Sequence, residues 1–186
     1  MKTKYTQKTP LTTLLLVCLV IVLSAAKCQK DNDPPEDKLP PITTEGKNTF
    51  GCKINGEVWV PWVHPFSILS KLSSGYDNGH FMVVATRRTE DDDQIMSINI
   101  FEKFYNEGEY SISPVENSRA IYTDSELLCE YMTDTIYNGV LNILRRDTMA
   151  GIISGTFSFT GYFSDDNDDC LEYIEVTDGR FDVFYK

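Results

Sequence analysis

Residues 152–163, with the sequence IISGTFSFTGYF, decide the fold class. Within this stretch Phe157 and Phe159 alternate with threonine and serine residues. Successive side chains of a strand point to opposite faces of a sheet, so this alternation predicts a β-strand with one buried face. Outward from this stretch, strand patterns recur from residue 49 to the end of the chain.

Turn signals separate these strand patterns. Asn-Gly and Asp-Gly dipeptides favour tight hairpins, because the central positions of such turns need positive φ angles. The clearest hairpin signal is the pair of runs 173–177 and 180–185 on either side of Asp178-Gly179. The other dipeptides are Asn55-Gly56, Asn78-Gly79 and Asn138-Gly139, and the other strand-like runs include 81–86, 95–101, 136–137 and 140–144.

The spacing of these signals predicts an all-β fold of about ten short strands. Evidence for helices is thin, because the three-residue spacing of Phe66, Leu69 and Leu72 covers no more than two turns. We therefore expect an antiparallel β-sandwich. A closed or partly open β-barrel is the alternative, since both folds bury alternate residues along each strand.

Composition and charge limit the number of domains and the partners. The chain has 186 residues, of which 41% are hydrophobic, enough for one domain with a buried core at residues 49–186. The formal net charge is −11, and without residues 1–27 the chain keeps 13 basic and 28 acidic residues, a charge of −15. A protein with this negative charge repels the phosphate backbone of nucleic acids and anionic lipid headgroups. We therefore expect no nucleic acid partner.

The N-terminus has the pattern of a signal peptide. Lys2, Lys4 and Lys8 form a basic start, and residues 14–23 are an unbroken apolar run of ten, LLLVCLVIVL. A permanent membrane span needs about 20 apolar residues, so this run predicts a cleaved signal peptide over residues 1–27. Any membrane contact of the mature protein is then expected through its N-terminus only.

Small residues lead from the apolar run to Cys28, and this arrangement resembles the lipobox of bacterial lipoproteins. The resemblance implies that Cys28 is acylated, with palmitate for example, and becomes the new N-terminus. Lys27 departs from the pattern, because the position before the cysteine is normally small. The rival cleavage site follows Ala26, where Ser24 and Ala26 satisfy the small-x-small rule, and would give a periplasmic or secreted protein.

The segment 28–48 is expected to be a disordered tether. It is rich in Pro, Asp and Lys and has almost no large apolar residue before Phe50, so it buries too little surface to offset its ordering entropy. The sequence CQKDND at 28–33 also resembles the acidic motif that sends lipoproteins of the Bacteroidetes type to the outer face of the outer membrane. A plain solvated spacer is the alternative.

Three cysteines remain after Cys18 leaves with the signal peptide and Cys28 carries lipid: Cys52, Cys129 and Cys170. An exported compartment permits oxidation, so one disulfide and one free thiol are expected. Cys129 with Cys170 is the favoured pair, because both begin strand-like runs beside polar segments. Cys52 shares strand parity with Phe50, which suits a small core residue, and is the alternative partner. Without a CxxC motif, zinc is not expected.

Trp59 and Trp62 are candidate ligand-binding residues. They lie in the stretch VWVPWVHPF at 58–66, where two prolines disfavour a regular central strand. Flat aromatic faces near Asp or Asn suit sugar rings, through stacking and hydrogen bonds to hydroxyls. The alternative is that these rings close one end of the core.

Asp165, Asn167 and Asp169 are weak calcium candidates, because dense Asp/Asn loops can supply the oxygen ligands that calcium prefers. The loop is not an EF-hand, since Cys170 occupies the position that needs glycine and Val176 the position that needs glutamate. A solvated hairpin turn is the alternative. The second acidic cluster, 90–93, is open to the same two interpretations.

The catalytic inventory is poor. His64 and His80 are the only histidines, and neither lies in a nucleophile motif. The chain has no glycine-rich phosphate loop and no nucleotide-cofactor fingerprint. We therefore expect no enzymatic activity and no cofactor.

Three segments together resemble an uncharacterised family of β-rich lipoproteins of the Bacteroidetes type, a domain of unknown function. They are 49–61 (TFGCKINGEVWVP), 154–159 (SGTFSF) and 177–182 (TDGRFD). The resemblance implies a surface lipoprotein with a β fold and implies no catalytic role. The expected function is that of a cell-envelope lipoprotein at the outer membrane, with a non-catalytic domain that binds a glycan or a protein. A structural envelope protein is the alternative, and a hydrolytic enzyme is less expected.

Overall fold

The computed structural model describes residues 38–89, 92–101 and 106–185. The predicted signal peptide and Cys28 lie outside these residues. Among the described residues there is no α-helix, and the only helical element is the 3-10 turn η1 (Pro114–Glu116). The strands are β1 (Thr49–Ile54), β2 (Glu57–Trp59), β3 (Leu72–Asp77), β4 (His80–Arg88), β5 (Asp93–Ile100), β6 (Gly108–Ile112), β7 (Ser118–Asp124), β8 (Cys129–Met132), β9 (Gly139–Asp147), β10 (Ile152–Phe163) and β11 (Tyr173–Phe184).

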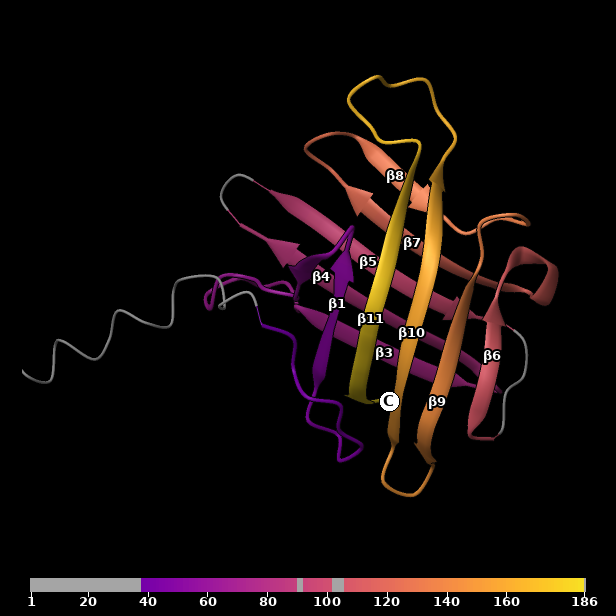
Figure 1. Ribbon diagram of the computed structural model, residues 1–186. Helices are drawn as coiled ribbons and strands as arrows, with labels where there is room; N and C mark the ends of the chain where they lie inside the picture. The colour runs from indigo at the N-terminus through magenta and orange to yellow at the C-terminus, as the bar shows by residue number, and fades with distance from the viewer. Residues whose placement is uncertain (1–37, 90–91, 102–105, 186) are drawn as a thin grey trace, which may run out of the picture. The chain divides into compact units, whose positions relative to one another are not determined.

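The strands pair antiparallel into one 11-stranded sheet in the order β2-β1-β11-β10-β8-β7-β5-β4-β3, and β9 and β6 extend from β10. Only Tyr162 and Phe163 of β10 pair with β8, and the sheet folds over at this junction. Figure 1 shows the result as two layers, with β1, β11, β10, β9 and β6 in front of β3, β4, β5, β7 and β8. The predicted antiparallel all-β fold is confirmed, as a half-barrel intermediate between a sandwich and a partly open barrel.

Alternate residues of both layers form the core between them. Phe157 and Phe159 of β10 are 4% and 3% exposed, while Ser158 between them is exposed. Phe181 of β11 stacks on Phe81 of β4 at 5.5 Å between ring centroids, which joins the two layers. The alternation in the sequence thus predicts the buried face correctly, because side chains of period two can fill only one side of a layer.

Two of the four dipeptides form the predicted hairpins. Asn55-Gly56 joins β1 to β2, and Asn78-Gly79 joins β3 to β4. In both turns the Asn has a φ near +50° and the Gly near +90°, the left-handed conformations that such two-residue turns require.

The Asp178-Gly179 dipeptide does not form a hairpin, and the prediction there is wrong. β11 runs straight through it, and two residues of β11 stand opposite the single Ser158 of β10. This is a β-bulge, with Asp178 at a φ of +52°. A Cβ on Gly179 would lie 2.5 Å from the Phe157 ring. The dipeptide therefore supplies positive φ and close packing inside a strand, rather than a reversal.

Asn138-Gly139 also forms no hairpin, and residues 136–137 are not a strand. Gly139 is the first residue of β9, and the Asn138 carbonyl accepts a hydrogen bond from the Thr160 N–H at 3.0 Å. A Cβ on Gly139 would lie 2.4 Å from the Cβ of Phe159. Glycine is needed here because β9 begins this close to β10.

Asp182 fixes the chain segment that enters β1. Asp182 is 1% exposed. Its carboxylate accepts hydrogen bonds from the Thr43 hydroxyl and from the N–H groups of Glu45, Gly46 and Lys47, at 2.7–3.0 Å. Residues 38–48 are therefore ordered against the domain, which corrects the expectation of disorder over that part of segment 28–48. The reason is that one buried carboxylate satisfies the backbone donors of this segment, while the Leu39 and Pro40 side chains lie beside Gly51.

A disulfide joins Cys129 to Cys170, with 5.8 Å between the Cα atoms. It ties the start of β8 to the loop between β10 and β11. Cys52 is a free, fully buried thiol on β1, and its Sγ lies 3.7 Å from the Met96 Sδ. Burial raises the pKa of the Cys52 thiol well above its usual value, so this thiol is both shielded and protonated.

Candidate functional site

Trp59 is a core residue, and its predicted role in an exposed ligand site is wrong. It is 4% exposed, its ring packs edge-on against Phe50 and Tyr122, and its indole N–H donates to the Gln94 Oε1 at 2.7 Å. The structure therefore agrees with the alternative for Trp59, in which its ring belongs to the core.

Trp62 lies elsewhere. After β2 the chain leaves the first layer, and the Trp62 backbone pairs with β4 of the second layer through Thr86 and Arg88, at 3.0 and 2.7 Å. Its half-buried ring contacts His64 edge-on at 6.4 Å. Trp59 and Trp62 therefore share no surface, because the chain crosses between layers at the Pro61 that separates them.

The calcium candidates lie in the loop between β10 and β11. The Asn167 side chain is used within the protein, since its Nδ2 donates to the Leu127 carbonyl at 3.0 Å and its Oδ1 accepts from the Asp169 N–H at 3.1 Å. Asp165 and Asp169 are exposed. Among the residues that the structure describes, no group of three or more His, Cys, Asp or Glu side chains is arranged to hold a metal ion.

The other acidic cluster is only partly described, since residues 90–91 are outside the described ranges. Asp93 forms an ion pair with Arg88. The pKa of Asp92 is raised, first by burial and then by the nearby carboxylates of Asp124 and Glu126.

Both histidines are exposed. His64 lies in the loop before β3, and His80 is the first residue of β4.

A group of three tyrosines lies on the outer face of the front layer. Tyr162 of β10 is paired in register with Tyr173 of β11, and the ring of Tyr137 stacks on both. The Tyr137 ring is 5.3 Å from the Tyr162 ring and 6.1 Å from the Tyr173 ring, with interplanar angles of 4° and 14°. We call Tyr137, Tyr162 and Tyr173 the tyrosine surface.

Strand alternation places two of these rings outward. Gly161 and Phe163 of β10 and Ile174 of β11 face the core, so Tyr162 and Tyr173 face away from it. Tyr137 comes from the loop before β9. The Asp134 carboxylate accepts hydrogen bonds from the Ile136 and Tyr137 N–H groups and holds this loop in a tight turn.

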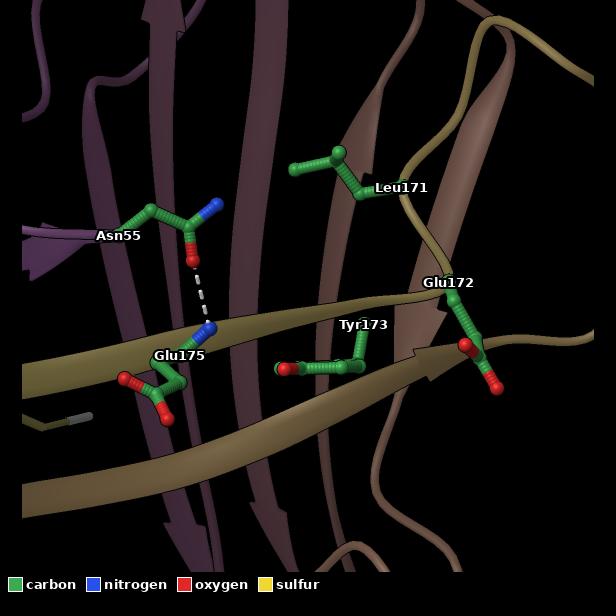
Figure 2. A pocket seen from close by; sticks show the side chains of 5 residues that line it. All are labelled: Asn55, Leu171, Glu172, Tyr173 and Glu175. Carbon is green, nitrogen blue, oxygen red and sulfur yellow. Dashed lines mark hydrogen bonds between the residues drawn. The ribbon is translucent and has the colours of Figure 1, made fainter.

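A hollow of 530 Å³ opens beside Tyr173. The residues that line it are Asn55, Leu171, Glu172, Tyr173 and Glu175 (Figure 2). Tyr173 is 48% exposed and Leu171 is 59% exposed, so the hollow has apolar as well as polar surface. Figure 2 shows the hydroxyl end of Tyr173 directed to the side on which Glu175 and Asn55 lie.

The walls of the hollow are held by hydrogen bonds. The Glu175 N–H donates to the Asn55 Oδ1 at 2.8 Å, which fixes the side chain of the β1–β2 turn (Figure 2). The Leu171 N–H donates to the Tyr131 hydroxyl at 3.0 Å, and the Phe163 N–H donates to the Glu172 carbonyl at 3.0 Å. With the disulfide at Cys170 next to Leu171, the hollow is preorganised.

Sequence reasoning missed the tyrosine surface. The alternation of residues 152–163 already implies that Tyr162 faces outward, and the predicted run 173–177 begins at Tyr173, as β11 does. Tyr137 had no such signal, because its position depends on the irregular loop held by Asp134. The turn at Asn55 was predicted, but its contact with β11 is not a local property of the sequence.

Comparisons with known proteins give one match. A family model described as a domain of unknown function (DUF6252) matches residues 71–184, which include the tyrosine surface but not Asn55. No curated protein and no solved structure matches the chain. Within the described part of the chain, no helix has the length and apolar character to cross a membrane.

Proposed function

The chain belongs to the DUF6252 family, a domain of unknown function, and from this premise we propose that it is a cell-envelope lipoprotein whose β domain is a non-catalytic binding module. The observation that carries the binding role is the stacked tyrosine surface, in which Tyr173 is exposed and Tyr137 and Tyr162 are half-buried, with its adjoining hollow. An aromatic side chain left in water forgoes the free energy that its burial would contribute. A group of such side chains held in place is therefore typical of an interaction site.

The proposed address rests on the N-terminal sequence. The basic start, the apolar run 14–23 and the small residues before Cys28 together support cleavage and acylation at Cys28. The acidic residues that follow, and the resemblance to β-rich lipoproteins of the Bacteroidetes type, support the outer face of the outer membrane. Cleavage after Ala26 would instead leave a periplasmic or secreted protein with the same β domain.

A thiol count on the mature protein tests the lipid anchor. With Cys28 acylated and Cys129 bonded to Cys170, we expect no reaction of the native protein with Ellman's reagent, because Cys52 is buried and its pKa is raised. One thiol per chain should react in guanidinium chloride without reductant. Intact mass should show a chain starting at Cys28 with two or three acyl groups. A second reactive thiol and a chain starting at Lys27 would contradict the anchor.

Radical footprinting on intact cells tests the binding role without assuming a ligand. We expect Tyr173 to be oxidised at least about fivefold more slowly in cells than in the purified protein, because a bound ligand covers its exposed ring. Met149 is 97% exposed and lies on the β9–β10 turn, so it serves as the internal control and should react equally in both samples. Equal oxidation of Tyr173 in both samples would sink the binding proposal.

A further inference from the structure

We propose that the hollow beside Tyr173 is a carbohydrate-binding site, in which the Tyr173 ring stacks on the apolar face of a neutral sugar or an amino sugar. The inference rests on the proposed binding function and assigns it a ligand class. Its basis is the combination of a fixed aromatic face, a fixed amide and two carboxylates around one hollow.

Neighbouring rings hold the aromatic face in place. Tyr173 stacks on Tyr137 at 6.1 Å, and Tyr137 stacks in turn on Tyr162 at 5.3 Å with nearly parallel planes. The Tyr137 loop is held by Asp134. A side chain held in this way loses little conformational entropy on binding, so the stacking energy of the ring is retained in the complex.

The polar groups match the hydroxyls at the rim of a sugar ring. The Asn55 Oδ1 is engaged by the Glu175 N–H at 2.8 Å, and its Nδ2 donates to no residue in the described part of the chain. That nitrogen is therefore available as a donor. The carboxylates of Glu172 and Glu175 form no ion pair with described residues, and they can accept hydrogen bonds from hydroxyls or from an amino group.

Charge selects among sugars. Two carboxylates line the hollow, and the whole chain has a net charge of −11. Like charges repel across a site of this size, so uronic acid polymers and phosphorylated glycans are disfavoured. A ligand with one apolar face, many hydroxyls and no negative charge satisfies the aromatic, amide and carboxylate groups together. Neutral hexoses, pentoses and amino sugars have this chemistry.

Calorimetric titration of the mature protein in detergent micelles tests the site. The probes are the linear hexasaccharides of glucose, mannose, xylose, glucosamine and N-acetylglucosamine, with polygalacturonate as the anionic comparison. We expect binding of at least one hexasaccharide and none of polygalacturonate. Tyr173→Ala should weaken that binding about tenfold or more, while Tyr173→Phe keeps the ring and most of the affinity. Asn55→Asp keeps the acceptor for the Glu175 N–H but removes the donor, and should weaken binding about three- to tenfold.

Phe66→Ala is the matched control, because Phe66 is an aromatic residue 86% exposed on a different loop and its removal should leave the affinity unchanged. Melting temperatures within the error of wild type show that each variant is folded. Affinity that survives Tyr173→Ala, or no hexasaccharide binding at millimolar concentration, overturns the inference. Protection of Tyr173 in cells without hexasaccharide binding would remove the carbohydrate assignment alone. An oligolysine peptide tests whether the carboxylates of the hollow bind a cationic protein instead. Binding of this peptide without hexasaccharide binding would also remove the carbohydrate assignment alone.

Discussion

Replacing Asp182 by alanine is expected to lower the free energy of unfolding by about 3 kcal/mol, because several donors lose a buried, charged acceptor at once. The donors are the Thr43 hydroxyl and three backbone N–H groups of the segment before β1. Guanidinium unfolding measures the loss. Trypsin should also cut after Lys47 faster in this variant, because the segment is released from β11.

Asp178→Asn is the control on the same strand. Asp178 is exposed and pairs with Lys53 at 2.9 Å, and Asn tolerates the positive φ of this position. Its replacement should cost less than about 1 kcal/mol. Equal stability of Asp182→Ala and wild type would mean that the segment 38–48 contributes nothing to the fold.

The same carboxylate makes stability depend on pH. Burial alone would raise the pKa of Asp182, but the hydrogen bonds from Lys47, Thr43, Gly46 and Glu45 outweigh it, and the pKa lies below its usual value. A pKa depressed by folding contributes stability above the unfolded value of about 3.9, and this contribution is lost as the pH falls through the folded value. Below about pH 4, wild type should therefore lose stability more steeply than Asp182→Ala.

Removal of the disulfide should be the other large effect. Cys129 and Cys170 are 41 positions apart, and opening a loop of this length costs about 3 to 4 kcal/mol in the chain-entropy model. We expect the double variant Cys129→Ala/Cys170→Ala to unfold at correspondingly lower guanidinium concentration. Leu171 and Glu172, which line the hollow, should exchange their amide hydrogens faster, because the loop between β10 and β11 loses its tie to β8.

Reduction provides the matched control for this variant. Dithiothreitol should lower the stability of wild type to that of the double variant and should leave the double variant unchanged. The buried Cys52 is common to both proteins and makes no disulfide. A double variant as stable as oxidised wild type would show that the link does not limit unfolding.

The β class and two hairpins could be predicted from the sequence because they depend on local chemistry. A strand is the arrangement that places the Phe157 and Phe159 rings on one buried face. The Asn55-Gly56 and Asn78-Gly79 dipeptides adopt positive φ angles at little cost in free energy. These features belong to the residues themselves, whatever surrounds them.

Asp178-Gly179 shows where local chemistry is not sufficient. The dipeptide suits both a two-residue turn and a bulge, and the choice depends on β1 and β10, which pair with β11 on either side. A strand with partners on both sides makes more backbone hydrogen bonds when it continues through the dipeptide than when the chain reverses there. Register between distant strands cannot be derived from a dipeptide.

The candidate site shows the same limit. The sequence placed the candidate site at Trp59 and Trp62, but Trp59 is buried by Phe50 and Tyr122, which come from different strands. Tyr137 and Tyr173 are 36 positions apart and meet only when the loop before β9 lies against the outer face of β10 and β11. Which aromatic ring is exposed is therefore decided by tertiary packing.

The position of β11 also sets the order in which the chain can fold. This last strand lies between β1 and β10, and β1 otherwise pairs only with the short β2. A chain still emerging N-terminus first cannot complete its front layer until residues 173–184 are available. Late closure of such distant contacts makes folding slow. For the export proposed above, this order means that a chain crossing a membrane N-terminus first cannot complete its front layer before residues 173–184 have crossed.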